Sequence, residues 1–338
     1  MNRRDGSFRI RGRAAGVLAA VILVVGVPAR AAFPGPNGSI LFESDRDPGD
    51  VWSMEADGSA ATNLTNSSAG STPVRAEASP DGATIAFDTN RDGNREIYLM
   101  AGDGSGQHNI TNEPSGEIGP AWSPDGNRIA FLTDRDHAGV TTELYVMNAD
   151  GSNAIRLTNN EEIIETNPAW SPDSSKIAFQ ATEPGVGIDI LTVNPDGTGA
   201  ANLTTDMSEA AGEPDWTPDG NAIFFSHAEE IWRMNADGTG KTPVITGHFD
   251  HAPQVSPDGT KLTYQRLVPA DDVLDSEVIV ANIDGSGQVN ITNRAGFDAP
   301  DDWSVRPGSQ SEGPITGLLR SLGLSAVADL LCGFGVCI

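Results

Sequence analysis

The chain has 338 residues, with 47 acidic and 21 basic side chains and a formal net charge of −26. Such an acidic surface repels the phosphates of nucleic acids and of anionic lipids, so we expect no nucleic acid as a partner. The 38 Gly and 22 Pro, with aromatic residues at only 6%, indicate many tight turns between short strands rather than disorder.

Residues 1–31 are predicted to be a cleaved export signal. Five arginines up to Arg13 precede an apolar stretch from Ala14 to Val27, and Ala29-Arg30-Ala31 provides an A-x-A cleavage site. The alternative is an uncleaved anchor, but a stretch of about 14 apolar residues is short for crossing a bilayer. Cleavage would leave 15 basic and 46 acidic side chains and no transmembrane helix in the mature chain.

The segment that follows repeats one phrase six times. Aligned on the turn Pro124-Asp125-Gly126, the third turn residue recurs at steps of 44, 44, 48, 46 and 39 residues. A second turn, written Asp-Gly, also occurs once in each repeat. Two turn markers that recur together, with several short strands per unit, predict the blades of a β-propeller. The third turn residues are Gly38, Gly82, Gly126, Ser174, Gly220 and Gly259, and an Asp-Gly pair begins at Asp57, Asp103, Asp150, Asp196, Asp237 and Asp284.

Each repeat contains four short strands, A to D. Strand A ends near a Trp or its substitute, the Pro-Asp-Gly turn leads into an apolar strand B, and strands C and D flank the Asp-Gly turn. The first repeat lacks strand A, and a seventh copy of that strand stands alone around Trp303. We therefore predict an all-β fold over residues 32–307: a six-bladed β-propeller of four-stranded antiparallel blades, in which residues 299–307 complete blade one and close the ring.

The phrases WSPDG, IAF, LYVMNADG and RLT together resemble the WD40-like (PD40) repeats of the TolB family, the periplasmic component of the Tol–Pal system. The resemblance covers about 270 residues and implies an exported bacterial protein, periplasmic or extracellular, whose propeller serves as a docking surface. TolB also carries a globular α/β domain ahead of its propeller, and here only a few residues separate the predicted signal from blade one. The resemblance therefore favours an interaction module over a true Tol–Pal role.

Acidic residues recur on the face that carries the predicted B–C turns and D–A connections. Each stands five positions before the Trp, or its substitute, near the end of strand A, which we call the strand A landmark. Because strand A is normally innermost in a propeller, we predict that these side chains ring the mouth of the central channel and bind a ligand there. A solvated rim without a specific site is the other interpretation. The four residues are Glu117, Glu165, Asp250 and Asp298.

The loop of blade two suggests a calcium site. Asn90, Asp92, Asn94 and Glu96 alternate along the loop and supply the oxygen ligands that Ca²⁺ prefers. The twelve-residue spacing of an EF-hand loop is absent, so an ordinary hairpin turn is the other interpretation. No other cofactor is predicted.

The sequence contains no catalytic motif. His248 and His251 form at most half of a transition-metal site, and no nucleophile elbow, P-loop or dinucleotide fingerprint occurs. We expect a non-catalytic scaffold that binds an extracytoplasmic protein or a cell-envelope component. A hydrolase or lyase acting on polysaccharide or peptide at the acidic face is the alternative, because carboxylate catalysts leave no local motif.

Residues 308–338 are predicted to form a linker and a short apolar helix between Pro314 and Leu331. Cys332 and Cys337, the only cysteines, are expected to pair in an exported chain. The apolar tail either caps the base of the propeller, docks a partner or dimerises, and the sequence leaves these alternatives open.

Overall fold

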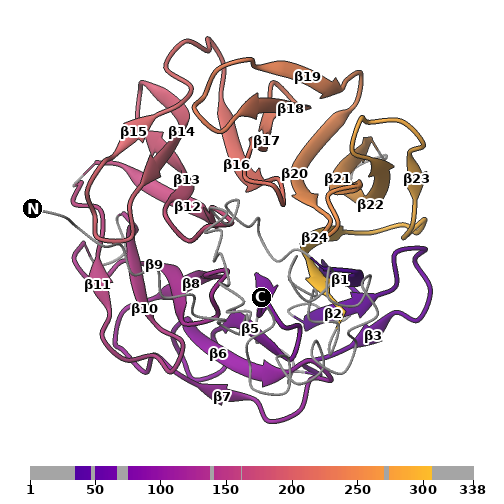
Figure 1. Cartoon of the computed structure of the whole chain (residues 1–338). Helices are drawn as coiled ribbons and strands as arrows, with labels where there is room; N and C mark the ends of the chain where they lie inside the picture. The colour runs from indigo at the N-terminus through magenta and orange to yellow at the C-terminus, as the bar shows by residue number, and fades with distance from the viewer. Residues whose placement is uncertain are drawn as a thin grey trace, which may run out of the picture.

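A computed structural model describes residues 35–46, 50–66, 75–137, 141–160, 162–269 and 274–306. These residues form six four-stranded antiparallel sheets arranged as a ring around a central axis (Figure 1). The fold is therefore the predicted all-β, six-bladed propeller. No helix in the described part of the chain is long and apolar enough to span a membrane.

The sheets follow one another around the ring in chain order, apart from one strand. Blade one is β24 (Asp298–Val305), β1 (Asn37–Ser44), β2 (Asp50–Met54) and β3 (Thr62–Asn63), from the axis outwards. Blade two is β4 (Ala76–Ala78), β5 (Thr84–Thr89), β6 (Glu96–Ala101) and β7 (His108–Asn109), and blade three is β8 (Glu117–Trp122), β9 (Arg128–Thr133), β10 (Glu143–Asn148) and β11 (Ile155–Arg156). Blade four is β12 (Ile164–Trp170), β13 (Ile177–Glu183), β14 (Gly187–Val193) and β15 (Ala201–Asn202).

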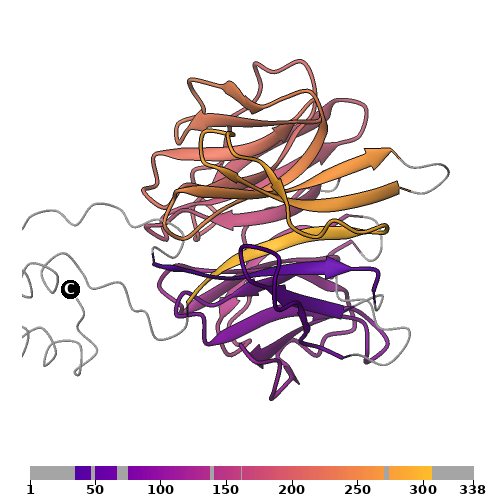
Figure 2. The same ribbon diagram turned by 90° about the vertical axis from the view of Figure 1, so that its right-hand side faces the viewer.

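Blade five is β16 (Ala211–Trp216), β17 (Ala222–His227), β18 (Glu230–Asn235) and β19 (Thr242–Ile245). Blade six is β20 (Phe249–Val255), β21 (Lys261–Pro269), β22 (Leu274–Asn282) and β23 (Val289–Asn290). The hairpin of β21 and β22 is longer than the others and, in orange, extends beyond the neighbouring strands at one face of the ring (Figure 2).

Aspartate side chains set the hairpin turns that define the repeat. In blade three the Asp125 carboxylate accepts hydrogen bonds from the Ser123 hydroxyl at 2.6 Å and the Asn127 amide at 3.0 Å. After β10 the Asp150 carboxylate accepts from the backbone and hydroxyl of Ser152, at 3.0 and 2.6 Å. These bonds hold the carboxylate in its charged form, so the pKa of Asp150 is lowered. The turn residues of the motif are therefore architectural.

A threonine that follows strand D in most blades has a structural role as well. The Thr158 hydroxyl accepts the backbone N–H of Leu144 at 2.8 Å, which ties the short strand D to strand C of the same blade. The same bond recurs in four other blades, to Thr65, Thr111, Thr204 and Thr292.

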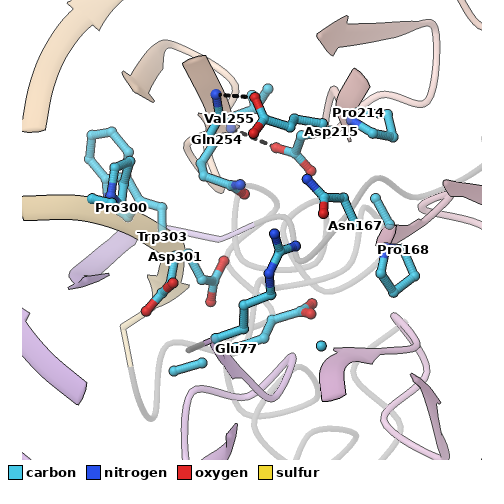
Figure 3. Close-up of a pocket in the computed structure, with 18 of the residues that line it drawn as sticks. Glu77, Asn167, Pro168, Pro214, Asp215, Gln254, Val255, Pro300, Asp301 and Trp303 are labelled. Carbon is cyan, nitrogen blue, oxygen red and sulfur yellow. Dashed lines mark hydrogen bonds between the residues drawn. The ribbon is translucent and has the colours of Figure 1, made fainter. Parts of the chain in front are cut away.

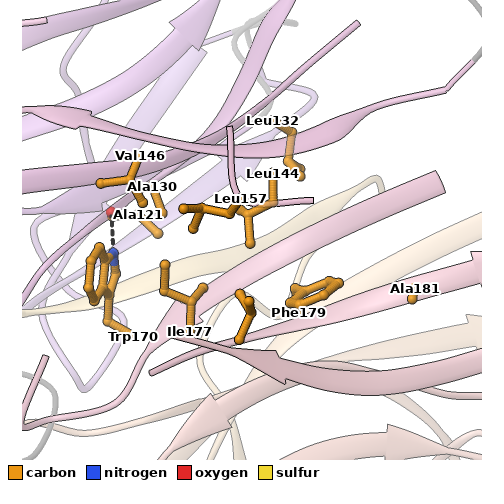
Figure 4. Packing of buried hydrophobic residues seen from close by; sticks show 11 residues of the cluster. Ala121, Ala130, Leu132, Leu144, Val146, Leu157, Trp170, Ile177, Phe179 and Ala181 are labelled. Atoms are coloured by element: carbon orange, nitrogen blue, oxygen red, sulfur yellow. Dashed lines mark hydrogen bonds between the residues drawn. The ribbon is translucent and has the colours of Figure 1, made fainter. Parts of the chain in front are cut away.

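The hydrophobic core lies between blades rather than within them. One cluster joins side chains of blade three, such as Leu144 and Leu157, to Trp170 and Phe179 of blade four (Figure 4). The Trp170 side chain is buried, and its indole N–H donates to the Ala121 carbonyl of the preceding blade at 3.0 Å. A single blade cannot bury both of its faces, so each one depends on its neighbours for stability.

A glycine in each C–D turn provides the closest approach between blades. Gly151 has φ +85°, and a Cβ on it would lie 2.1 Å from the Ile110 carbonyl oxygen of the preceding blade. The turn glycine is therefore required both by its left-handed backbone and by the lack of space. An added Cβ would overlap a carbonyl oxygen of the preceding blade in the same way at Gly58, Gly104 and Gly285, at 2.2, 2.3 and 2.5 Å. At Gly197 and Gly238 it would make a tight contact, at 3.2 and 3.0 Å.

Strand β24 closes the ring, as predicted. It pairs with β1 in antiparallel register from Ser44↔Asp298 to Asn37↔Val305, so residues from the two ends of the ring share one sheet. Trp303 on β24 is 2% exposed. The closure leaves no open sheet edge between the first and last blades.

We predict that removing β24 destabilises the whole ring rather than fraying one end. A chain ending at residue 298 should lose its single cooperative thermal transition or show a much lower Tm, because β1 then becomes an unpaired edge. A chain ending at residue 307 keeps β24 and serves as the control. Equal Tm values for the two truncations would contradict this account of closure.

We also predict that Gly151→Ala lowers the free energy of unfolding by about 3 kcal/mol or more, because left-handed strain adds to overlap with a backbone oxygen. Gly106→Ala is a matched control, since Gly106 has φ +69° but no atom within 4 Å of an added Cβ. It should cost only the backbone strain, about 1 kcal/mol. Urea unfolding measures both, and equal costs would rule out the contact between blades as the cause.

Candidate functional site

A cavity of about 280 Å³ lies on the axis of the ring, between the innermost strands of the blades (Figure 3). Prolines and tryptophans form part of its wall, and Asn167, Gln254 and Gln265 are among its neutral polar side chains. The charged side chains that line it are Glu43, Arg75, Glu77, Glu213, Asp215, Asp301 and Asp302.

Bulges in the innermost strands build this wall. The registers of β8, β12, β16 and β20 against their partners each shift at the residue that precedes a proline. At these positions Gly119, Asn167, Glu213 and Ala252 have φ values of +59°, +55°, +54° and +50°. Non-glycine residues rarely adopt this conformation, and such strained positions and bulges concentrate at functional sites, where they re-aim side chains.

The axial carboxylates also tie neighbouring blades together. The Asp302 carboxylate accepts the backbone N–H of Ala78 at 2.9 Å. The Asp215 carboxylate accepts that of Val255 at 2.7 Å (Figure 3). Glu77 accepts the backbone N–H of Trp122 in the same manner. Each bond crosses from the innermost strand of one blade to that of the next, so these three acids hold fixed positions around the axis.

Burial at the axis disfavours the charged forms of these acids. The side chains remain partly exposed to the cavity, but protein surrounds them on the other sides. Burial raises the pKa of Asp215 to about 7 and the pKa of Asp302 to about 6. Burial also raises the pKa of Glu77 well above its ordinary value, and the charges of Asp302 and Asp215 add to that effect.

The acidic residues predicted at the channel mouth occupy a different position. Glu117, Glu165, Asp250 and Asp298 are 0% exposed, and none is among the residues that line the axial cavity. Arg135 lies 3.2 Å from Glu117, Arg266 lies 2.7 Å from Asp250, and Arg46 lies 3.5 Å from Asp298. Glu165 accepts the Asn160 side-chain amide at 3.0 Å, and burial raises its pKa to about 8. These contacts give the four acids structural partners, and their binding role stays a prediction.

The side chains of the predicted calcium loop also contact other protein groups. The Asp92 carboxylate accepts the Tyr98 hydroxyl, and Glu96 accepts the Thr111 hydroxyl. Asn94 directs its amide nitrogen, rather than its oxygen, to the carbonyls of Glu113 and Ser115, and the Asn90 carbonyl closes a turn with Gly93. Among the residues with described positions, no three or more His, Cys, Asp or Glu gather into a metal-binding group. Calcium binding by this loop stays a prediction.

Several other predictions fall outside the part of the chain that the structure describes. These are the export signal at residues 1–31, the linker and tail at residues 308–338, and the pairing of Cys332 with Cys337.

The sequence does contain a signal for the axial residues, although the repeat motif did not reveal it. A residue followed by proline stands three positions before the strand A landmark at Gly119, Asn167, Glu213 and Ala252. Proline inside an innermost strand indicates a bulge, because it cannot donate a ladder hydrogen bond. Read across the repeats, these dipeptides mark where side chains leave the sheet and turn to the axis.

A family model for the TolB β-propeller domain (PD40) matches residues 136–306, just over half of the chain. The chain is 30% identical over 109 residues to an uncharacterized protein of Agrobacterium fabrum, covering 31% of this chain and 36% of that protein. It is 34% identical over 88 residues to an uncharacterized peptidase of Bacillus subtilis, YuxL, covering 26% of this chain and 13% of that one. The chain thus matches well under two thirds of the length of these relatives.

Solved structures share the fold. The putative TolB from Agrobacterium tumefaciens superimposes with a TM-score of 0.62 at 20% identity, covering 81% of this chain and 95% of that chain. TolB from Acinetobacter baumannii gives a TM-score of 0.66 at 18% identity, covering 83% and 69%. At this level of identity the likeness shows the propeller fold alone.

The raised pKa values predict that the ring loses stability as pH rises. A carboxyl that binds its proton more tightly in the folded chain stabilises the fold fully at low pH, and this contribution is lost as pH rises through the folded pKa. With the pKa of Asp302 at about 6 and that of Asp215 at about 7, Tm should fall between pH 5 and pH 8.

The variant Asp215→Asn should show a shallower fall, because the amide carries no charge at any of these pH values. Asp196→Asn is the control: the exposed Asp196 carboxylate has a lowered pKa, so its stabilising contribution is already complete at pH 5. Differential scanning calorimetry across this range measures the slopes. Identical slopes for wild type and Asp215→Asn would contradict the assignment.

Proposed function

Because the chain belongs to the family of TolB β-propeller domains, we propose that it is an exported, non-catalytic interaction module. It binds an extracytoplasmic protein or a cell-envelope component in the periplasm or outside the cell. The axial cavity receives a positively charged group of that partner, and no cofactor is needed for binding.

The observation that carries this proposal is the excess of acid in the axial cavity. Away from the axis, several buried acids are paired with arginine, as in the pairs Arg135–Glu117 and Arg266–Asp250. Among the residues with described positions, the cavity wall instead carries six carboxylates and one basic side chain, Arg75. Unmatched acids at a partly closed site favour a ligand that brings the missing positive charge.

The rigidity of the ring supports binding of this kind. The cavity residues stand on innermost strands that are tied to one another by the bonds of Asp302 to Ala78 and of Asp215 to Val255. A site held in place before binding loses little conformational entropy when the ligand arrives. A module of this build works as a scaffold with a fixed receptor on its axis.

A second candidate function is hydrolysis or elimination on a polysaccharide or peptide. Carboxyls whose pKa is raised toward neutrality, such as Asp215 at about 7, are suited to general acid and base catalysis. A relative named as a peptidase is consistent with it, although only 13% of that protein is matched. Chemical cross-linking of the chain in the native envelope or medium separates the two functions: one stoichiometric protein partner favours the module, whereas depolymerised glycan or cleaved peptide without a partner favours the enzyme.

We predict that the purified full chain binds a capped peptide with one lysine more tightly than the same peptide with glutamate in its place. Asp215→Asn should weaken the binding of the lysine peptide about tenfold at pH 8, because it removes one negative charge close to the ligand. Added salt should weaken this binding further. Asp196→Asn, an exposed turn change outside the cavity, should leave the affinity unchanged. Calorimetric titration measures these affinities, and no preference for lysine would reject the axial receptor.

A further inference from the structure

We propose that Arg75 is an internal counter-ion that determines which cations the axial cavity accepts. It occupies one part of the cavity, pairs electrostatically with the carboxylates there, and leaves the remaining carboxylates to a ligand with a single positive charge. This inference rests on the proposed function of the cavity as a receptor for a cationic group.

Arg75 occupies a special position in the repeat. It precedes β4 at the place held in the other blades by Gly119, Asn167, Glu213, Ala252 and Pro300, and it is the only basic residue in this set. The backbone is held by a hydrogen bond from the Asp88 amide to the Arg75 carbonyl at 3.3 Å. The side chain extends toward blade three, since a Cβ built on Gly119 would lie 3.7 Å from Arg75 Cδ.

Two sets of carboxylates at or near the cavity differ in the charges that act on them. Burial raises the pKa of Glu43, Asp88 and Asp301, and the positive charge of Arg75 offsets part of that rise. We call Glu77, Asp215 and Asp302 the unmatched triad. The neighbouring charges that act on Glu77 and Asp215 are acidic, whereas Asp302 is affected by burial and by backbone hydrogen bonds. Figure 3 shows Glu77, Asp215 and Asp301 directed toward the same space, so the two sets face one cavity.

This division has a consequence for specificity. A single ammonium group can approach the unmatched triad and stay away from the Arg75 guanidinium. A ligand with two adjacent positive charges must bring one of them near Arg75 in a cavity of about 280 Å³, and like charges at such short range repel strongly where water is scarce. Arg75 therefore favours a ligand with one compact cationic group over a polycation.

The test compares two capped peptides, one with a single lysine and one with two adjacent lysines, by calorimetric titration of the full chain at pH 8. The two-lysine peptide carries more charge, and the salt dependence of its binding measures the contribution of that extra charge. When this contribution is subtracted, wild type should bind the one-lysine peptide more tightly than the two-lysine peptide. Arg75→Gln should tighten binding of the two-lysine peptide about tenfold and that of the one-lysine peptide by less. Arg75→Lys keeps the charge and should behave as wild type.

Two controls keep the outcome interpretable. Arg233→Gln makes the same charge change on β18, outside the cavity, and should leave both affinities unchanged. If Arg75→Gln fails to fold, the double variant Arg75→Gln, Asp301→Asn removes one acid together with the base. It should still discriminate less than wild type against the two-lysine peptide, because the repelling guanidinium is gone, and a preference equal to that of wild type would reject the role of Arg75. Wild type binding neither peptide would reject the proposed function itself. Wild type binding the single lysine with no change in preference in Arg75→Gln would reject only the role of Arg75.

Discussion

The pairing of β24 with β1 is the interaction on which the rest of the molecule depends. It joins residues some 260 positions apart, such as Ile40 and Trp303, in one sheet. Without it, the first blade would present an unpaired edge, and every other blade would lose part of the packing that it receives around the ring. Because core clusters such as that of Trp170 and Phe179 lie between blades, their stability depends on the ring being complete.

The same closure creates the cavity and constrains what lines it. Six innermost strands converge on the axis, where their backbones must bend away from one another, and bulges at residues such as Asn167 and Glu213 provide the bend. Carboxylates that emerge there accept N–H groups of the next blade, as Asp302 does from Ala78. One set of side chains thus joins the blades and gives the cavity its negative charge, so the stability of the ring and its affinity for a cation respond to the same protonation events.

Much of the fold was predictable from local chemistry, whereas the site was not. Turns such as Pro124-Asp125-Gly126 have a fixed residue pattern because an aspartate and a glycine satisfy the turn by themselves. Glu117 and Asp250 have a regular spacing for another reason, because each pairs with an arginine of its own blade. Arg135 lies just after β9, and Arg266 lies on β21. A regular spacing shows that a residue has the same structural role in several blades, and it does not indicate a binding role. The axial residues differ from blade to blade, so they do not stand out in an alignment of the repeats.

The sequence by itself determined the number of blades, the four strands in each and the closure of the ring by its last strand, because turns and strand patterns depend on residues close together in the chain. Only the tertiary structure decided that Asp215 and Asp302 share one space with Arg75 and Glu77, since these residues come from blades far apart in the sequence. It also decided that Glu117 and Asp298 are buried beside arginines. Burial and the distances between charges set the properties of a carboxylate, and both arise only when the ring has closed.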